Sequence, residues 1–244
     1  MLHVVVLAAG KGTRMVSSLA KVLHEAAGRP LLTWVLDAVG GLNPDRVVVV
    51  VGHQADEVRR LLPADSVAVI QEPQLGTGHA VMIAMDAATV GGDDTVVVVP
   101  GDMPLVRAAS LVELLEAHAS AGVAATVLTA VVAEPGTHGR VLRDASGVVT
   151  AIVEHADATS AQQEVPEVNT SVYAFRAAPL MAALAALRPD NAKGELYLTD
   201  VVARLTESGH RVSAVVLGDP EEALGVNTPD ELAQAAQILA ERAV

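Results

Sequence analysis

The sequence predicts a single α/β domain with a Rossmann-like, mixed but mostly parallel central sheet and helices on both faces. Short runs rich in Val and Ile alternate with longer Ala- and Leu-rich segments along the 244 residues, which indicates βαβ units. The Val-rich runs are continuously apolar, a pattern typical of strands that helices cover on both sides. Hydrophobic residues make up 51% of the chain, enough to bury one large core.

The first half of the chain alternates strands with helices. Strands are predicted over 4–7, 46–51, 67–71 and 95–99, and helices over 31–39, 56–62 and 79–88. Ala8-Ala9-Gly10 ends the first strand and Gly40-Gly41 ends the first helix, because glycine punctuates regular elements. Right-handed crossovers between parallel strands then place the helices on the two faces of the sheet.

The middle of the chain changes character, and the last third returns to an α/β pattern. Strands are predicted over 123–132, 140–143, 148–153 and 168–175, with a hairpin turn at Asp144-Ala145-Ser146-Gly147. This region is expected to add antiparallel strands and a cleft large enough for a sugar. Thr228-Pro229-Asp230-Glu231 has the spacing of a capping box with Pro at the first helical position, which predicts a terminal helix.

Composition excludes several classes of function. The formal charge of −13 disfavours nucleic acid and anionic membranes as partners. One Trp, two Tyr and one Phe offer few rings on which bases or sugars could stack. Without cysteine there is no thiolate nucleophile, disulfide or Cys-based zinc site. The sequence shows neither a leader pattern nor an apolar stretch of about 18 residues, so we expect a cytoplasmic protein.

The first chemical motif follows the first strand directly, as Leu7-Ala8-Ala9-Gly10-Lys11-Gly12-Thr13-Arg14-Met15. The carboxyl end of a strand is where open α/β folds bind ligands. Small residues allow the backbone to approach a phosphate closely, and Lys11 and Arg14 add positive charge. The spacing fits neither a dinucleotide fingerprint nor a Walker loop. The alternative is a plain turn that needs flexible residues.

Lys21 lies a few residues further on, in Ala20-Lys21-Val22-Leu23. A lone Lys is usually a solvated surface residue. Here the neighbours are small or apolar rather than charged, which favours a lysine held in a defined position by the fold. We therefore treat Lys21 as a second candidate phosphate-binding residue beside Arg14.

These blocks resemble the opening signature of bacterial nucleotidyltransferases that act on sugar 1-phosphates. Within them the chain is most similar to the uridyltransferase half of the bifunctional N-acetylglucosamine-1-phosphate uridyltransferase/glucosamine-1-phosphate acetyltransferases. Further blocks in the same order support the resemblance: 74–81, Gly101-Asp102-Met103-Pro104-Leu105, Gly139-Arg140, 151–154, Glu167-Val168-Asn169-Thr170, 194–200 and Gly225-Val226-Asn227. The resemblance implies a nucleotide-diphospho-sugar transferase fold. It also implies uridylyl transfer from UTP to N-acetylglucosamine 1-phosphate, which gives UDP-N-acetylglucosamine for cell-wall precursor synthesis and releases pyrophosphate.

The resemblance implies a Mg²⁺ site formed by Asp102 and Asn227. Asp102 follows an apolar strand, where a carboxylate is well placed as a hard oxygen ligand. Asn227 offers an amide oxygen just before the predicted terminal helix. On the residues alone, Asp102 could be a turn or N-cap residue and Asn227 a turn residue. Mg²⁺ prefers few protein ligands together with substrate phosphates, which two oxygens suit.

Nucleotide and sugar contacts are carried over from the family to matching positions. Leu7, Ala8, Ala9, Gly10 and Lys11 are expected to contact the nucleotide, and Gln71, Gly76 and Thr77 to recognise uracil. Gly139, Glu154 and Asn169 are expected to hold the sugar, since carboxylate and amide groups match hydroxyl and acetamido groups. Lone Gln and strand-end Glu residues are otherwise mostly surface residues. His24 and His79 are interpreted as structural, because this reaction needs no base of that pKa.

The implied reaction rests on positioning and charge neutralisation. Arg14 and Lys21 are the catalytic candidates, with Arg14 on the departing phosphates and Lys21 near the reacting centre. Two alternatives remain open: a transferase for another base or sugar, and a catalytically silent nucleotide-sensing module. Four residues depart from the family pattern, in loops and on the sugar side of the cleft: Ala20, His138, Ser171 and Leu196.

The resemblance also predicts how the chain is divided. The nucleotide-binding part is expected over about 1–110, the sugar-binding part over about 111–227 and a terminal helix over about 229–243. The hexapeptide repeats of the family's acetyltransferase β-helix domain are absent from the sequence, so acetyl transfer is not expected. The chain is either a portion of a longer enzyme or a stand-alone transferase. Its oligomeric state cannot be predicted without the β-helix half.

Overall fold

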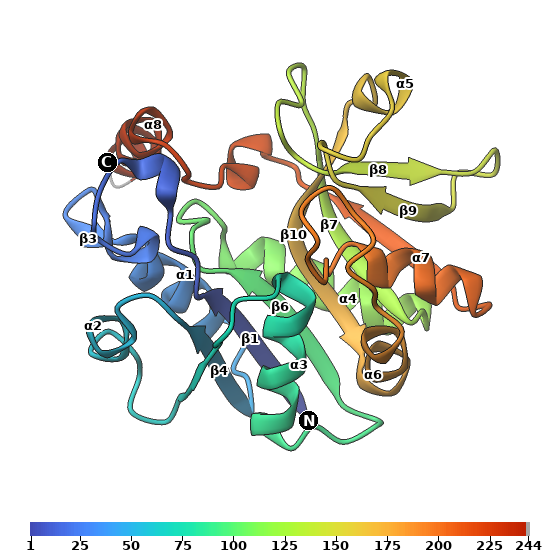
Figure 1. The fold of residues 1–244 in the computed structure, drawn as a ribbon, viewed down its shortest axis with the longest axis horizontal. Helices are drawn as coiled ribbons and strands as arrows, with labels where there is room; N and C mark the ends of the chain where they lie inside the picture. The colour runs from blue at the N-terminus through green and yellow to red at the C-terminus, as the bar shows by residue number, and fades with distance from the viewer. Residues whose placement is uncertain (243–244) are drawn as a thin grey trace.

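The computed structural model describes residues 1–242 and contains a nine-stranded sheet in the order β11-β7-β10-β6-β1-β4-β5, with β8 and β9 attached beside β10 (Figure 1). A small two-stranded sheet, β2–β3, lies apart from it. The strands are β1 (Leu2–Ala8), β2 (Glu25–Ala26), β3 (Arg29–Pro30), β4 (Arg46–Val51), β5 (Val67–Ile70), β6 (Thr95–Pro100), β7 (Ala125–Val131), β8 (Arg140–Arg143), β9 (Val149–Val153), β10 (Glu167–Arg176) and β11 (Val212–Val216).

The sheet is mixed, with a parallel half that carries the nucleotide motifs. β1 lies between β4 and β6 and pairs with both in parallel, and β4 pairs in parallel with β5. β10 runs antiparallel to β6, β7 and β8, while β11 returns to a parallel pairing with β7. The predicted fold class is therefore confirmed, including the antiparallel strands in the middle of the chain.

Helices cover both faces of the sheet, as the continuously apolar strands require. One cluster packs α3, α6 and α7 against one face, and a second packs α1, α2 and α4 against the other. The helical elements are η1 (Thr13–Met15), η2 (Lys21–Leu23), α1 (Leu31–Gly40), α2 (Ala55–Arg59), α3 (Thr77–Ala88), α4 (Ala108–Ala121), α5 (Ser160–Gln163), α6 (Ala177–Ala185), α7 (Asp200–Glu207), η3 (Pro220–Ala223) and α8 (Pro229–Arg242).

The terminal helix α8 belongs to a third cluster near the N-terminal motif. Its Ala235, Ile238 and Leu239 pack with Met15 and Val226. Figure 1 shows α8 beside β3 and above α1, far from the β8–β9 hairpin. The predicted capping box is present, because the Glu231 N–H donates to the Thr228 hydroxyl and the Thr228 N–H donates to Glu231. Residue 243, the predicted end of this helix, lies outside the described residues.

Most predicted elements are confirmed within a residue or two, and α2 is the clearest difference. The helix predicted over 56–62 ends at Arg59, and Pro63 keeps helical backbone from continuing through Leu62. The chain instead continues in tight turns, with Leu61 and Leu62 donating to residues three positions earlier. Among residues 1–242 no helix is both long and apolar enough to cross a membrane.

Candidate functional site

A cleft of about 490 Å³ opens at the carboxyl ends of β1 and β6 and extends toward β9 and β10. It is lined by all but two of the predicted site residues: Leu7, Ala9, Gly10, Arg14, Lys21, Gln71, Gly76, Thr77, Asp102, Gly139, Glu154, Asn169 and Asn227. Residues that the sequence separates by more than 200 positions therefore share one cavity. Their shared placement supports one common site.

Ala8 and Lys11 are the two predicted residues outside that lining. Ala8 is the last residue of β1, and its side chain is buried in the core on the α1 face, so only its backbone could reach a ligand. Lys11 borders a neighbouring hollow together with His53 and Glu72. The predicted nucleotide contacts of both residues remain predictions.

The glycine-rich turn brings the two catalytic candidates together. Gly12 has φ of 68°, in the left-handed region that suits glycine, and ends the turn before η1. A Cβ built on Gly12 would lie 2.7 Å from the Cβ of Lys21. Gly12 thus lets the loop pass directly over Lys21, while the space beside Gly10 stays open. This close approach explains why glycine stands at position 12.

Arg14, Lys21, Asp102 and Asn227 converge in the cleft. The Lys21 ammonium forms an ion pair with Asp102 Oδ2 and donates to Asn227 Oδ1 at 2.9 Å. The Arg14 guanidinium donates to the same Asn227 oxygen at 3.0 Å. The side chains of Lys21 and Asp102 are 16% and 19% exposed, so the pair is partly desolvated but open to a ligand.

The backbone around Asn227 is held on both sides. The Asn227 N–H donates to Glu231 Oε2 at 2.7 Å, so the carboxylate of the capping box also fixes the residue before the box. The Val226 N–H donates to the Asp102 carbonyl at 2.9 Å. Asp102 and Asn227 are therefore linked through backbone as well as through Lys21.

The donor set of this region fits Mg²⁺. Two oxygens, Asp102 Oδ2 and Asn227 Oδ1, are directed at one cation, Lys21 Nζ. Hard oxygen ligands few in number suit Mg²⁺, which keeps water and phosphate in its remaining positions. Within residues 1–242 no group of three or more His, Cys, Asp or Glu side chains is arranged for a metal. Asp102 and Asn227 therefore suit a metal that would also take substrate phosphates as ligands.

Gln71, Gly76 and Thr77 form the wall on the predicted nucleotide side. Gln71 is 6% exposed, and its Nε2 donates to the Gly76 carbonyl at 2.8 Å and contacts His79 Nδ1 at 3.3 Å. The Thr77 hydroxyl accepts from the Leu198 N–H at 2.9 Å. His79 therefore contacts a buried side chain, which agrees with its interpretation as a structural residue. The Gln71 amide nitrogen is used in these two contacts, so the amide oxygen is left to accept a hydrogen bond from a ligand.

Gly76 allows α3 to begin against the 195–198 segment. Its φ is 108°, and an added Cβ would lie 2.6 Å from the Leu196 carbonyl oxygen and 2.9 Å from the Leu196 nitrogen. We expect Gly76→Ala to destabilise the protein by about 1–3 kcal/mol, through backbone strain and displaced packing. Urea unfolding measures this. Gly147→Ala is the matched control, since Gly147 has φ of 86° but nothing within 4 Å of the added Cβ. Equal losses in the two variants would contradict the steric explanation.

Gly139, Glu154 and Asn169 line the opposite end of the cleft. Asn169 is 3% exposed, and its backbone N–H donates to the Gly139 carbonyl at 2.9 Å. Its side-chain oxygen accepts from the Ser171 N–H at 3.0 Å, at a bulge where Ser171 adopts φ of 62°. The bulge re-aims β10 at the point where Asn169 faces the cavity. Ser171, which departs from the family pattern, therefore lies at the bulge in β10.

Glu154 is a half-buried carboxylate at the end of β9. Burial raises its pKa above the ordinary value, while the Thr199 hydroxyl, 3.1 Å away, and the charge of Lys193 oppose the rise. The native state therefore binds the proton more tightly than the unfolded chain does. Above both pKa values the charged group lowers stability, and below both the penalty disappears.

Glu154→Gln is expected to raise the thermal midpoint at neutral pH, with the gain fading as the pH falls below the ordinary Glu pKa. Glutamine keeps an acceptor for Thr199 and removes the buried charge. Thermal unfolding measured across pH tests this, with Glu207→Gln at the exposed C-terminal end of α7 as the control. A loss of stability at neutral pH would contradict the expected sign.

Several lining residues were not predicted as site residues. They include Gln74, Lys193 and Glu195. Gln74 Nε2 donates to the Ala9 carbonyl at 2.6 Å, so a residue from another segment stabilises the start of the glycine-rich turn. Lys193 lies over the ring of Tyr197 at 5.8 Å, and its charge acts on the Glu154 carboxylate. The 194–200 block was recognised, but its sequence gives no signal that it folds back to the start of α3.

Curated relatives match nearly the whole chain. A protein of Thermobifida fusca (strain YX) named "Bifunctional protein GlmU" is 49% identical over 242 residues, covering 97% of this chain and 50% of its own length. Proteins with the same name from Corynebacterium aurimucosum and Streptococcus equi subsp. zooepidemicus are 49% and 47% identical over 98% of this chain. The chain spans about half the length of these relatives. The resemblance inferred from the sequence motifs is confirmed.

A family model described as "MobA-like NTP transferase domain" matches residues 4–196. The matched range contains the glycine-rich turn, Lys21, Asp102, Glu154 and Asn169, whereas Asn227 lies beyond it. The match extends over most of the chain and agrees with the mixed sheet and the position of the cleft. On this ground the chain belongs to the MobA-like NTP transferase domain family.

Proposed function

We propose that the protein transfers the uridylyl group of UTP to N-acetylglucosamine 1-phosphate and releases pyrophosphate. The observation that carries the proposal is the convergence of Arg14, Lys21, Asp102 and Asn227 in one cleft, where Lys21 contacts Asp102 and Asn227 and Arg14 contacts Asn227. Two cations and two hard oxygens are the groups that phosphoryl transfer requires. The similarity to proteins named "Bifunctional protein GlmU" supports the same activity.

The sugar phosphate is already an anionic nucleophile, so the protein needs no general base. Its phosphate oxygen forms a bond to the α-phosphorus of UTP while the bond from that phosphorus to the bridging oxygen of pyrophosphate breaks. Arg14 holds the departing phosphates, since a guanidinium binds phosphate oxygens in pairs. Lys21 neutralises charge that develops on the transferred phosphate. Both act by position and charge, in a partly desolvated cleft where charge interactions are stronger than in bulk water.

Asp102 and Asn227 would hold Mg²⁺, which when bound supplies charge neutralisation and orientation to the nucleotide phosphates. The protein's remaining task is to place both substrates. Gln71 and the Gly76–Thr77 turn present an amide oxygen and backbone groups that complement the imide edge of uracil. Glu154 and Asn169 present a carboxylate and an amide at the other end, suited to sugar hydroxyl and acetamido groups.

The test is pyrophosphate release from UTP with N-acetylglucosamine 1-phosphate, with Mg²⁺ and with a chelator. The other nucleoside triphosphates and other sugar 1-phosphates complete the matrix. Metal-dependent release restricted to the named pair supports the reaction and both substrates. Release with a different pair would keep the reaction type and reassign the residues at the ends of the cleft. Silence in every combination would contradict the proposed activity and favour a nucleotide-sensing module.

A further inference from the structure

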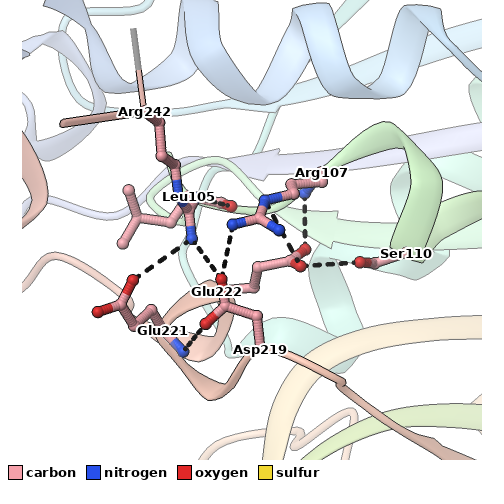
Figure 2. A network of polar contacts seen from close by, with 7 residues as sticks. All are labelled: Leu105, Arg107, Ser110, Asp219, Glu221, Glu222 and Arg242. Carbon is pink, nitrogen blue, oxygen red and sulfur yellow. Dashed lines mark hydrogen bonds and ion pairs between the residues drawn. The ribbon is translucent and has the colours of Figure 1, made fainter. Parts of the chain in front are cut away.

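Figure 2 shows a network of arginines and carboxylates, none of which is among the residues that line the cleft. We call it the 107–242 cluster, and its charged members are Arg107, Asp219, Glu221, Glu222 and Arg242. It joins the segment between β6 and α4 to the η3 segment and to the last turn of α8. The cluster thus ties together three parts of the chain that are distant in sequence.

Glu222 is the buried member of this cluster. The residue is 2% exposed, yet both of its carboxylate oxygens are used. Oε2 accepts from the Arg107 backbone N–H at 2.8 Å and Oε1 accepts from the Ser110 hydroxyl at 3.0 Å. These donors belong to the first turn of α4, whose N-cap residue makes no side-chain cap bond of its own. Glu222, which belongs to η3, therefore places its negative charge at the N-terminus of α4.

Asp219 is shared by two guanidinium groups. Arg107 donates to Asp219 Oδ2 at 2.6 Å and Arg242 donates to the same oxygen at 2.9 Å. Its other oxygen accepts from the Glu221 N–H at 3.1 Å and so caps η3. Arg242 also donates to the Leu105 carbonyl at 2.9 Å. Each arginine thus bridges the β6–α4 segment to the residues around η3.

The two bridged segments are the ones that carry the proposed Mg²⁺ ligands. Asp102 lies in the β6–α4 segment three residues before Leu105, and Asn227 lies five residues after Glu222. Within residues 1–242 the two ligand residues are also linked by the Val226 N–H to Asp102 carbonyl bond and by Lys21, which contacts both of their side chains. The separation of the two ligand oxygens therefore depends on how firmly the segments are fastened together.

We propose that the 107–242 cluster is a positioning element that sets Asn227 in register with Asp102 for metal binding. This inference rests on the proposed function, since it concerns the metal that the function uses. No member of the cluster lines the cleft, so none is a catalytic residue. Partners of metal ligands outside the ligand shell commonly change metal affinity by about 10- to 100-fold when they are removed.

The test measures UTP binding by calorimetry with Mg²⁺ and with a chelator, without sugar phosphate so that no turnover occurs. The ratio of the two affinities reports the coupling between metal and nucleotide. Glu222→Gln removes the buried charge while keeping its shape, and Arg242→Ala removes a partly exposed bridge and should fold readily. We expect each variant to lower the Mg²⁺ enhancement of UTP affinity by about 10- to 100-fold, with metal-free affinity unchanged. Arg242→Lys should restore part of the enhancement.

Arg143→Ala is the matched control. Arg143 forms an ion pair with Glu167, with a nitrogen–oxygen distance of 2.7 Å, and neither residue contacts Asp102 or Asn227. It should lose stability and keep the Mg²⁺ enhancement. The inference is overturned if both cluster variants keep the wild-type enhancement, if Arg143→Ala loses it equally, or if the wild type shows no enhancement. A wild type that shows the enhancement but releases no pyrophosphate would overturn the proposed function and leave the positioning role standing.

Discussion

Asp102→Ala is expected to lower turnover by at least about 10³-fold while the fold stays intact. Asp102 is the one carboxylate among the four converging groups, so its loss removes the charged ligand of the proposed metal and the partner of Lys21. The side chain is 19% exposed and lies outside the three apolar clusters. The structural effect should therefore be small beside the effect on turnover.

The measurement is pyrophosphate release over a wide range of Mg²⁺ concentrations, with circular dichroism to verify the fold. Asp56→Ala, which removes an exposed carboxylate paired with Arg59 on α2, is the control and should behave as the wild type. The turnover of Asp102→Asn should fall between those of Asp102→Ala and the control, since an amide oxygen binds Mg²⁺ but carries no charge. Wild-type turnover of Asp102→Ala at saturating Mg²⁺ would contradict the metal assignment.

Lys21→Met is expected to lower kcat by about 10²–10³-fold, the effect of removing one preorganised group from a transition state. Methionine retains the Cβ against which Gly12 packs, so the substitution removes charge rather than shape. The ammonium contacts both Asp102 and Asn227, which places it where phosphate charge would be neutralised. A contribution realised in the transition state lowers kcat more than it raises KM.

Steady-state kinetics of Lys21→Met and Lys11→Met separate a specific role from a general one. Both lysines belong to the same N-terminal region, but Lys11 is exposed and lies outside the cleft lining. Lys11 is predicted to contact the nucleotide, and a contact made equally in the ground state and the transition state affects KM rather than kcat, so Lys11→Met should change kcat by less than about fivefold. Equal effects of the two substitutions would show that only the overall positive charge of the region matters.

The parallel half of the fold could be predicted because each of its elements carries its own local signal. β1, β4 and β6 are uninterrupted apolar runs, and α1 ends where glycines follow. The terminal helix carried a complete capping box in sequence, and the structure forms it. Such elements depend on residues that are neighbours along the chain.

Features that depend on tertiary pairing were not predictable in the same way. β10 inserts antiparallel between β6 and β7, and Ser171 adopts its left-handed conformation at the resulting bulge. Nothing local in the sequence indicates that Glu222 would cap α4, more than 100 positions away. The candidate site was anticipated mainly through the family resemblance. The convergence of Lys21 with Asp102 and Asn227 is a property of the folded chain.

The ammonium of Lys21 also gives the free protein an internal counter-ion. Without substrate the Asp102 carboxylate is already neutralised by a cation that the chain itself supplies, so the metal must compete for an oxygen that is in use. Net metal affinity is then a difference between two attractions, and we expect weak binding of free Mg²⁺ that strengthens when nucleotide phosphates draw Lys21 away. On this reasoning Lys21→Met should bind free Mg²⁺ more tightly than the wild type even as its turnover falls. Weaker Mg²⁺ binding by that variant would show that the lysine supports the metal rather than competes with it.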